Sequence, residues 1–504
     1  MRDLNRKMAR GILWMGALKV SVRGIGLVSI VILARLLVPA DFGLIAMATS
    51  VLAFLELATS FSFDIPLIQN QKAERRHYDT AWTLNLIFHV ALTVLLVALA
   101  GPAASFYQEE RLVPVIYALS AGFFATGFSN IGVVQFRKEL DFRMDYWVML
   151  SQKLIGFVIT IPLALWLRSY WALVIGMVAG NVLGVAATYF LHPYRPRFSL
   201  SCAGEMFNFS KWLILNNAVQ FLRTRSPDFI IGRVSGTSAL GLFSISYEIS
   251  ALPISEIVAP INRVVFSGYS KLSSNIPLLR QSYTDTLAVI AICALPFGFG
   301  ISAVAVPLIE LFFGQKWAGA APLVGILGIF GGLHALHSNS GSIYNAIGKP
   351  YLITLTGACN ITVLVLASIV LILEYGVIGI AVAYLGTSVL LTPFNFFILC
   401  REIGLELAVL LSVLWRPLIA SIFMYACVAY TDTLVTASIT SNSAVRLVML
   451  FTEGLLAYLS ALWALWFISG RDKATAEYRL TLLLWRKAST LGAIRADKRP
   501  SQPS

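Results

Sequence analysis

Eight ionisable side chains lie well inside long apolar stretches of this 504-residue sequence. The set consists of five cations and three anions: Lys19, Arg23, Lys153, Arg223, Arg225, Glu56, Asp228 and Glu248. At roughly 3 kcal/mol for each charge at the centre of a bilayer, eight such groups facing lipid would cost on the order of 24 kcal/mol. We therefore expect them to face protein or a water-filled cavity.

The cations outnumber the anions inside these apolar stretches, which predicts a cavity that accepts an anionic group. Arginine suits this chemistry because its planar guanidinium group makes bidentate contacts to phosphate. Lys19 and Arg23 are four residues apart and share one helical face. The sequence predicts a substrate-binding set and no catalytic residue; the set is Lys19, Arg23, Lys153, Arg223 and Arg225.

The acids have two interpretations that the residues leave open. Arg225 and Asp228 are three residues apart, so they can pair and simply hold helices together. Alternatively, carboxylates in a membrane can bind H+ or Na+ and use an ion gradient. The acids with these candidate roles of ion coupling or cavity pairing are Glu56, Asp64, Asp228 and Glu248, of which Asp64 lies nearer the inner interface.

Membrane-spanning helices must carry these residues. Hydrophobic residues make up 58% of the sequence and charged residues only 12%, about half the charged fraction of soluble domains. No long polar stretch can fold as a separate soluble head, which argues against an enzyme of that kind. The five cysteines occur singly, so neither a disulfide framework nor a metal site is expected, and no motif indicates a cofactor.

Fourteen apolar windows are long enough to cross a bilayer, since one span needs about 20 residues. Their approximate limits are 11–37, 42–66, 81–101, 112–134, 146–167, 170–191, 208–232, 238–264, 285–313, 322–346, 352–374, 376–400, 415–431 and 446–469. The window at 415–431 is the shortest of them. The predicted fold is therefore an all-α integral membrane protein.

Most of the 38 Lys and Arg residues lie at alternate ends of these windows and in the tail from 471 to 504. Positive residues concentrate on the cytoplasmic side of membrane proteins, so we predict a multi-pass protein with both termini in the cytoplasm. The net charge of +13 then indicates an anionic phospholipid partner, and no nucleic acid is needed to explain it.

The two halves of the sequence match weakly at an offset of 198 residues. This offset aligns Trp14 with Trp212, Arg35 with Arg233 and Gly43 with Gly241, each pair at the same place in a window. Duplicated bundles with a site between them are typical of transporters. The predicted domains are six-helix bundles at 1–200 and 201–402, two appended helices at 403–470 and a basic cytoplasmic tail at 471–504.

His334 and His337 lie three residues apart in the tenth window. Without a carboxylate or cysteine motif to complete a metal site, a role in packing or in lining a cavity is expected for them.

Several strings in the sequence resemble the polysaccharide transporter family, which includes Wzx-type flippases. The strings are LARLLVPADFGLIAMA from Leu33, PLIQNQ from Pro66, QFRKELDFR from Gln135, the segment Asp228 to Leu272, LFFGQKWAGAAPLVGILG from Leu311 and NAIGKP from Asn345. They occur in order on a matching topology. One departure is the acid Asp64, where relatives usually have a glycine-containing segment without an acid.

The resemblance implies a MATE-like fold of the multidrug/oligosaccharidyl-lipid/polysaccharide (MOP) superfamily in a bacterial inner membrane. It also implies translocation of undecaprenyl-pyrophosphate-linked oligosaccharide for exopolysaccharide, capsule or O-antigen, by alternating access around a cationic central cavity. The expected partners are this lipid-linked oligosaccharide, anionic phospholipid, and a polysaccharide polymerase with its chain-length machinery. No cofactor is expected beyond H+ or Na+.

Two other functions are open on the residues alone. A cation-coupled multidrug efflux transporter would need a cavity that attracts organic cations, and the surplus of cations over anions inside the apolar stretches disfavours this function. A membrane glycosyltransferase or ligase would need acidic residues on a large outer loop. The predicted outer loops are short, which disfavours this function.

Overall fold

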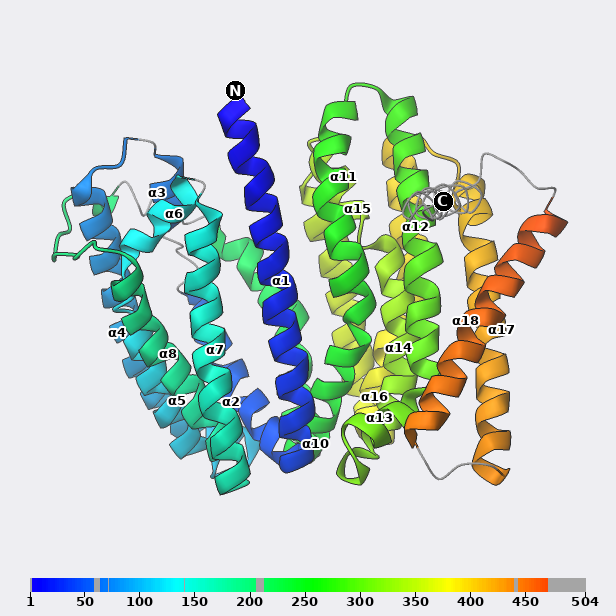
Figure 1. Cartoon of the computed structure of the whole chain (residues 1–504), viewed down its shortest axis with the longest axis horizontal. Coiled ribbons are helices and arrows are strands. Elements are labelled where there is room, and N and C mark those ends of the chain that lie inside the picture. The colour runs from blue at the N-terminus through cyan, green and yellow to red at the C-terminus, as the bar shows by residue number, and fades with distance from the viewer. Residues whose placement is uncertain are drawn as a thin grey trace, which may run out of the picture. The chain divides into compact units, whose positions relative to one another are not determined.

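The computed structural model describes residues 2–58, 64–70, 72–139, 141–204, 213–438 and 443–469. Within these ranges the regular structure is entirely helical (Figure 1). The predicted basic tail at 471–504 and Trp212 lie outside the described residues.

Most of the described helices follow one another with short connections. They are α1 (Arg2–Leu36), α2 (Pro39–Ala58), α3 (Asp64–Gln69), α4 (Arg75–Tyr107), α5 (Leu112–Thr126), α6 (Val134–Lys138), α7 (Phe142–Leu167), α8 (Trp171–Leu191), α10 (Leu213–Ser250), α11 (Ala259–Leu272), α12 (Ile276–Ala303), α13 (Ala305–Phe312), α14 (Ala320–His337), α15 (Ser340–Ala346), α16 (Tyr351–Ile403), α17 (Leu407–Ser438) and α18 (Ser443–Ile468).

Ten helical stretches of the described chain are long and apolar enough to cross a membrane, or eleven if the bent pair Leu112–Thr126 and Ile131–Lys138 is one span. Two of the ten are too long for one crossing, because Thr224–Leu272 has 49 residues and Tyr351–Ile403 has 53. Pro39–Leu55 is a shorter apolar helix. Each of the fourteen predicted windows falls mainly on helix in its described part, and the window 112–134 contains a turn at residues 127–130.

Glycine breaks the two overlong helices. Gly236 in α10 has φ 78° and Gly376 in α16 has φ 58°, and a residue with a side chain rarely adopts such angles. Gly236 lies between the predicted windows 208–232 and 238–264, and Gly376 is the first residue of the window 376–400. Each long helix is therefore two helices joined by a single non-helical residue, as the sequence predicted.

The chain forms two compact units. Unit 1 comprises Met1–Ile245, Phe312–Ala320 and Gly357–Ile380, and unit 2 comprises Ser246–Leu311, Ala321–Thr356 and Ala381–Ser504. In unit 1, α7 packs against both α1 and α8, and α5 packs against α4 and α8 (Figure 1). In unit 2, α17 packs against α12 and α18. The predicted bundle boundaries at 200 and 402 stay a prediction.

The repeat is visible in one reciprocal contact within unit 1. A Cβ atom added to Gly43 would collide with the carbonyl oxygen of Thr237, and one added to Gly241 would collide with that of Pro39. The offset of 198 relates Gly43 to Gly241 and also Pro39 to Thr237. The contact is thus unchanged when the two repeats are exchanged, which is the mark of a local two-fold relation.

The repeated arginines Arg35 and Arg233 are both exposed. Arg35 Nε donates to the backbone oxygen of Phe312 at 3.2 Å. Trp317, fully buried, donates its indole N–H to the Ala34 oxygen at 2.7 Å and packs edge-on against Phe42. These contacts explain why the segment Phe312–Ala320 belongs to unit 1 although it is distant in sequence.

Candidate functional site

Asp228, inside an apolar helix, accepts hydrogen bonds from two side chains. Ser50 Oγ on α2 lies 2.7 Å from Asp228 Oδ2 and donates to it, and Arg225 Nη1 lies 3.2 Å from the same oxygen. Ser50 is fully buried and Asp228 is 9% exposed, while the Arg225 side chain is 37% exposed. The predicted pair therefore forms, and it leaves the guanidinium group partly accessible.

Aromatic rings surround this pair. Phe229 follows Asp228 on α10, and its ring stacks on Tyr107 of α4 at 6.0 Å. Phe221 lies one turn before Arg225 and contacts both Phe229 and Phe54 of α2. Since rings of low polarity screen a charge poorly, an anion reaching Arg225 would bind more strongly than in water.

The α1 cations lie beside α7. Lys19 and Arg23 are both partly buried, one helical turn apart on α1. On the same helix Trp14 packs against Tyr146 of α7 at 5.2 Å, and Ser21 Oγ lies 3.4 Å from the Tyr146 hydroxyl. This stretch of α1 is therefore fixed against the first turns of α7.

Lys153 lies two turns after Tyr146 on the same face of α7 and is exposed. At the far ends of the two helices, Leu33 of α1 and Ala164 of α7 share a buried cluster. The helices consequently run parallel, which places Lys153 at about the depth of Arg23. The structure thus groups these two predicted cations along one pair of helices.

For the other predicted site residues the structure gives mainly the helix in which each one lies. Glu56 lies in α2, Asp64 begins α3 and Arg223 lies in α10, but their side chains are outside the described part of the structure. Glu248 lies in the part of α10 that belongs to unit 2 and is partly buried.

The His pair predicted for packing or cavity lining lies at the end of α14 in unit 2. The His334 and His337 rings lie 4.6 Å apart, and His337 Nδ1 lies 3.2 Å from Thr392 Oγ1. His334 also stacks on Phe330 at 5.2 Å. The contact of this pair with α16 carries no signal in the sequence, because spacing within one helix says nothing about the neighbouring helices.

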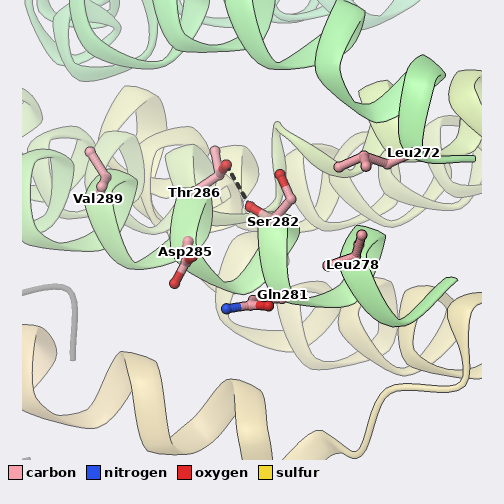
Figure 2. Close-up of a pocket in the computed structure, with 7 residues that line it drawn as sticks. All are labelled: Leu272, Leu278, Gln281, Ser282, Asp285, Thr286 and Val289. Atoms are coloured by element: carbon pink, nitrogen blue, oxygen red, sulfur yellow. Dashed lines mark hydrogen bonds between the residues drawn. The ribbon is translucent and has the colours of Figure 1, made fainter. Parts of the chain in front are cut away.

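A pocket of about 430 Å³ in unit 2 contains none of the predicted site residues (Figure 2). Gln281, Ser282, Asp285 and Thr286 of α12 line it with three apolar side chains, and the Thr286 hydroxyl donates to the Ser282 carbonyl oxygen at 2.8 Å. Its one ionisable lining residue, Asp285, is acidic. This pocket does not offer the positive charge that an anionic group requires.

Curated relatives act in several polysaccharide pathways. The chain is 24% identical over 432 residues to the lipopolysaccharide biosynthesis protein WzxC of Escherichia coli strain K12, covering 83% of this chain and 86% of the relative. It is 24% identical to the teichuronic acid biosynthesis protein TuaB of Bacillus subtilis strain 168, covering 91% and 96%. It is 25% identical to the succinoglycan biosynthesis transport protein ExoT of Rhizobium meliloti strain 1021, covering 65% and 67%.

Solved structures share the fold. The lipid II flippase MurJ in an inward closed conformation superposes with a TM-score of 0.70 at 15% identity, over 90% of this chain and 99% of that chain. An inward-facing multidrug resistance MATE transporter of the MOP superfamily gives 0.55 at 17% identity, over 76% and 94%. The predicted MATE-like fold is confirmed.

The sequence profile described as polysaccharide biosynthesis protein matches residues 32–322, more than half of the chain. This range includes the Gly43–Gly241 contact and the Ser50–Asp228–Arg225 cluster. The chain belongs to the polysaccharide biosynthesis protein family, as a multi-pass membrane protein.

Proposed function

We propose that this transporter moves an oligosaccharide linked to undecaprenyl pyrophosphate across the bacterial inner membrane, with both termini in the cytoplasm. The polymer made from this unit is an exopolysaccharide, capsule or O-antigen. The named pathways of the curated relatives and the flippase fold support the translocation of a lipid-linked unit.

One observation carries the assignment of the pyrophosphate to this chain. Arg225 is anchored through Nη1 to Asp228, while more than a third of its side chain is accessible within an aromatic surrounding. A guanidinium group has five N–H donors, so the ion pair leaves donors for a phosphate oxygen. Ser50 donates to the same oxygen of Asp228 and helps to keep the pair in place.

The other predicted cations extend this proposal. Lys19 and Arg23 on α1, Lys153 on α7 and Arg223 on α10 would supply further positive charge as the lipid headgroup crosses. We also propose that an H+ or Na+ gradient drives the cycle through Glu56, Asp64 or Glu248, since Asp228 already holds Arg225.

The test is complementation of a deletion strain with Arg225→Gln. Surface polysaccharide is expected to fall at least about tenfold, because the variant loses the charge that meets the pyrophosphate. Arg233→Gln is the matched control, since Arg233 lies on the same helix and is exposed. Membrane levels of both variants are measured by immunoblot. Normal polysaccharide with Arg225→Gln would contradict the proposed role of this arginine.

The predicted topology has its own check. Reporter fusions at residue 72 and at the C-terminus should both report the cytoplasm. A periplasmic C-terminal reporter would overturn the proposed orientation.

A further inference from the structure

Five aromatic and imidazole rings form a continuous strip in unit 2. The strip consists of Tyr247 on α10, Phe330, His334 and His337 on α14, and Tyr384 on α16. The ring centroids of Tyr247 and Tyr384 lie 5.6 Å apart, and those of Tyr384 and Phe330 lie 5.1 Å apart. From Phe330 the strip continues over 5.2 Å to His334 and 4.6 Å to His337. We call these five residues the ring strip.

The ring strip has a buried part and an accessible part. Phe330 and Tyr384 are 7% and 5% exposed, so they form its base. Tyr247 is 36% exposed, and both histidines are partly exposed. A ligand can therefore meet rings without first displacing the buried pair.

Polar side chains without hydrogen-bond partners lie on the same part of α16. Thr387 Oγ1, Ser388 Oγ and Asn395 Nδ2 have no partner among the described residues, although their residues are only 7%, 2% and 3% exposed. Buried polar atoms are nearly always paired, so such a group calls for an explanation. A ligand or ordered water that pairs with them in another state of the protein would supply one.

Helical spacing directs these polar groups toward the ring strip. Ser388 and Asn395 lie four and eleven residues after Tyr384, which puts all three on one face of α16. This face meets α14 at both ends, because Tyr384 contacts Phe330 and Thr392 contacts His337. Ser388 lies between those contacts, at about the level of His334.

This surface consists of rings, hydroxyl groups and an amide, whereas the unit 1 cluster contains the Arg225–Asp228 ion pair. The ring strip and its three polar neighbours contain no Asp, Glu, Lys or Arg. Aromatic faces and neutral hydroxyl or amide groups recognise ligands that have both apolar C–H faces and many hydroxyl groups. Sugars are ligands of that class, and a pyrophosphate is not.

We propose that the ring strip binds sugar residues of the transported lipid-linked oligosaccharide. This inference rests on the proposed function. Tyr247, His334 and His337 make the first contacts, since they are the accessible rings. Ser388 and Asn395 are enclosed in this conformation, so they pair with sugar hydroxyl groups only after α14 and α16 separate at this point.

The experiment uses the full-length protein in lipid nanodiscs and two probes. One probe is undecaprenyl pyrophosphate without sugar, and the other is the lipid-linked oligosaccharide extracted from the deletion strain. Tyr247→Ala and Asn395→Leu should each weaken binding of the sugar-bearing probe about tenfold, because each removes a contact made only by sugar. Binding of the sugar-free probe should stay within about twofold of wild type.

Matched variants separate this inference from the proposed function. Tyr430→Ala removes a tyrosine that is 68% exposed on α17 in the same unit, and should leave both dissociation constants unchanged. Arg225→Gln should weaken the binding of both probes. If wild type binds neither probe, the proposed function fails. If wild type binds both probes equally, or if Tyr247→Ala weakens both to the same extent, the sugar assignment is wrong.

Discussion

Asp79 and Asp228 are two buried carboxylates in unit 1 with different surroundings. Asp79, 7% exposed near the start of α4, accepts the Tyr194 hydroxyl at 2.7 Å and the Arg197 backbone N–H at 2.9 Å. Asp228 accepts a serine hydroxyl and an arginine side chain inside an apolar helix. Asp79 also lies 3.7 Å from Nε of Arg75, whose side chain is 56% exposed. The first carboxylate therefore holds a loop beside a surface arginine, whereas the second holds a cation inside an apolar helix.

The loop that Asp79 holds is fixed by a second buried group. Asn130, fully buried, donates from Nδ2 to the backbone oxygens of His192 at 3.1 Å and Tyr194 at 2.9 Å. The groups that Asp79 and Asn130 bind thus include backbone groups of this loop, and the exposed arginine beside Asp79, Arg75, is the first residue of α4. Around Asp228, in contrast, both donors are side chains on apolar helices, and Arg225 stays partly accessible. The position of the accessible arginine inside an apolar helix, rather than burial of the acid, distinguishes the candidate binding group from the structural one.

The largest expected effect on the free energy of unfolding is that of Asp79→Ala. Loss of two short hydrogen bonds to a buried carboxylate should cost about 3 kcal/mol, because the Tyr194 hydroxyl and the Arg197 N–H lose their acceptor. Thermal unfolding in detergent measures this loss. Surface polysaccharide should fall only in proportion to the amount of protein in the membrane. Wild-type unfolding temperature in this variant would show that Asp79 does not anchor the loop.

Asp228→Asn should have a smaller effect on stability and a larger one on transport. The amide keeps the shape and an acceptor for Ser50, and a partly exposed ion pair contributes about 1 kcal/mol or less. Arg225 loses its charged anchor, however, so polysaccharide per molecule of membrane protein should fall severalfold. Quantifying both polysaccharide and protein tests this. A drop in protein with normal polysaccharide per molecule would reverse the proposed contrast with Asp79.

The smallest expected effect is a pH dependence from His192 in the same loop as Tyr194. His192 Nδ1 accepts the Tyr194 backbone N–H at 3.1 Å, and Nε2 lies 3.1 Å from Gln135 Oε1, an arrangement that suits a neutral ring. Burial lowers the pKa of His192 below its usual value. At a pH just below the usual histidine pKa, the unfolded chain therefore binds more protons than the folded protein. The free energy of unfolding consequently falls as the pH drops below that usual pKa.

The check on this pH dependence is the variant His192→Gln. Its unfolding temperature should decrease less than that of wild type between about pH 7 and pH 5, because the titrating ring is gone. Equal decreases in the two proteins would show that His192 does not contribute.

Much of the fold was predictable because each span carries its own signal. The length of an apolar stretch identifies a membrane crossing whichever segments pack against it, and the predicted limits at 232/238 and 374/376 lie close to the breaks at Gly236 and Gly376. The bend after α5 and the long α17 were less predictable. Residues 112–134 read as one window, but Asn130 begins a short turn there by accepting the Gly132 N–H at 2.9 Å.

The candidate site was predictable only in part. A charge in an apolar window is visible in the sequence, and the spacing of Arg225 and Asp228 predicted their pairing. Ser50 carries no such signal, since a serine in a membrane helix is ordinary. The ring strip was missed for the same reason, because Tyr247, Phe330 and Tyr384 are common residues on three separate helices.

The sequence by itself determined that this protein is a helical membrane protein, where its helices lie and which of them carry charge. These properties depend on hydrophobicity and spacing along one segment. Only the tertiary structure decided that Gly43 meets the Thr237 backbone, that Ser50 meets Asp228 and that Tyr384 meets Phe330. Such contacts depend on which helix faces which, and a local pattern holds no information about the residue across the interface.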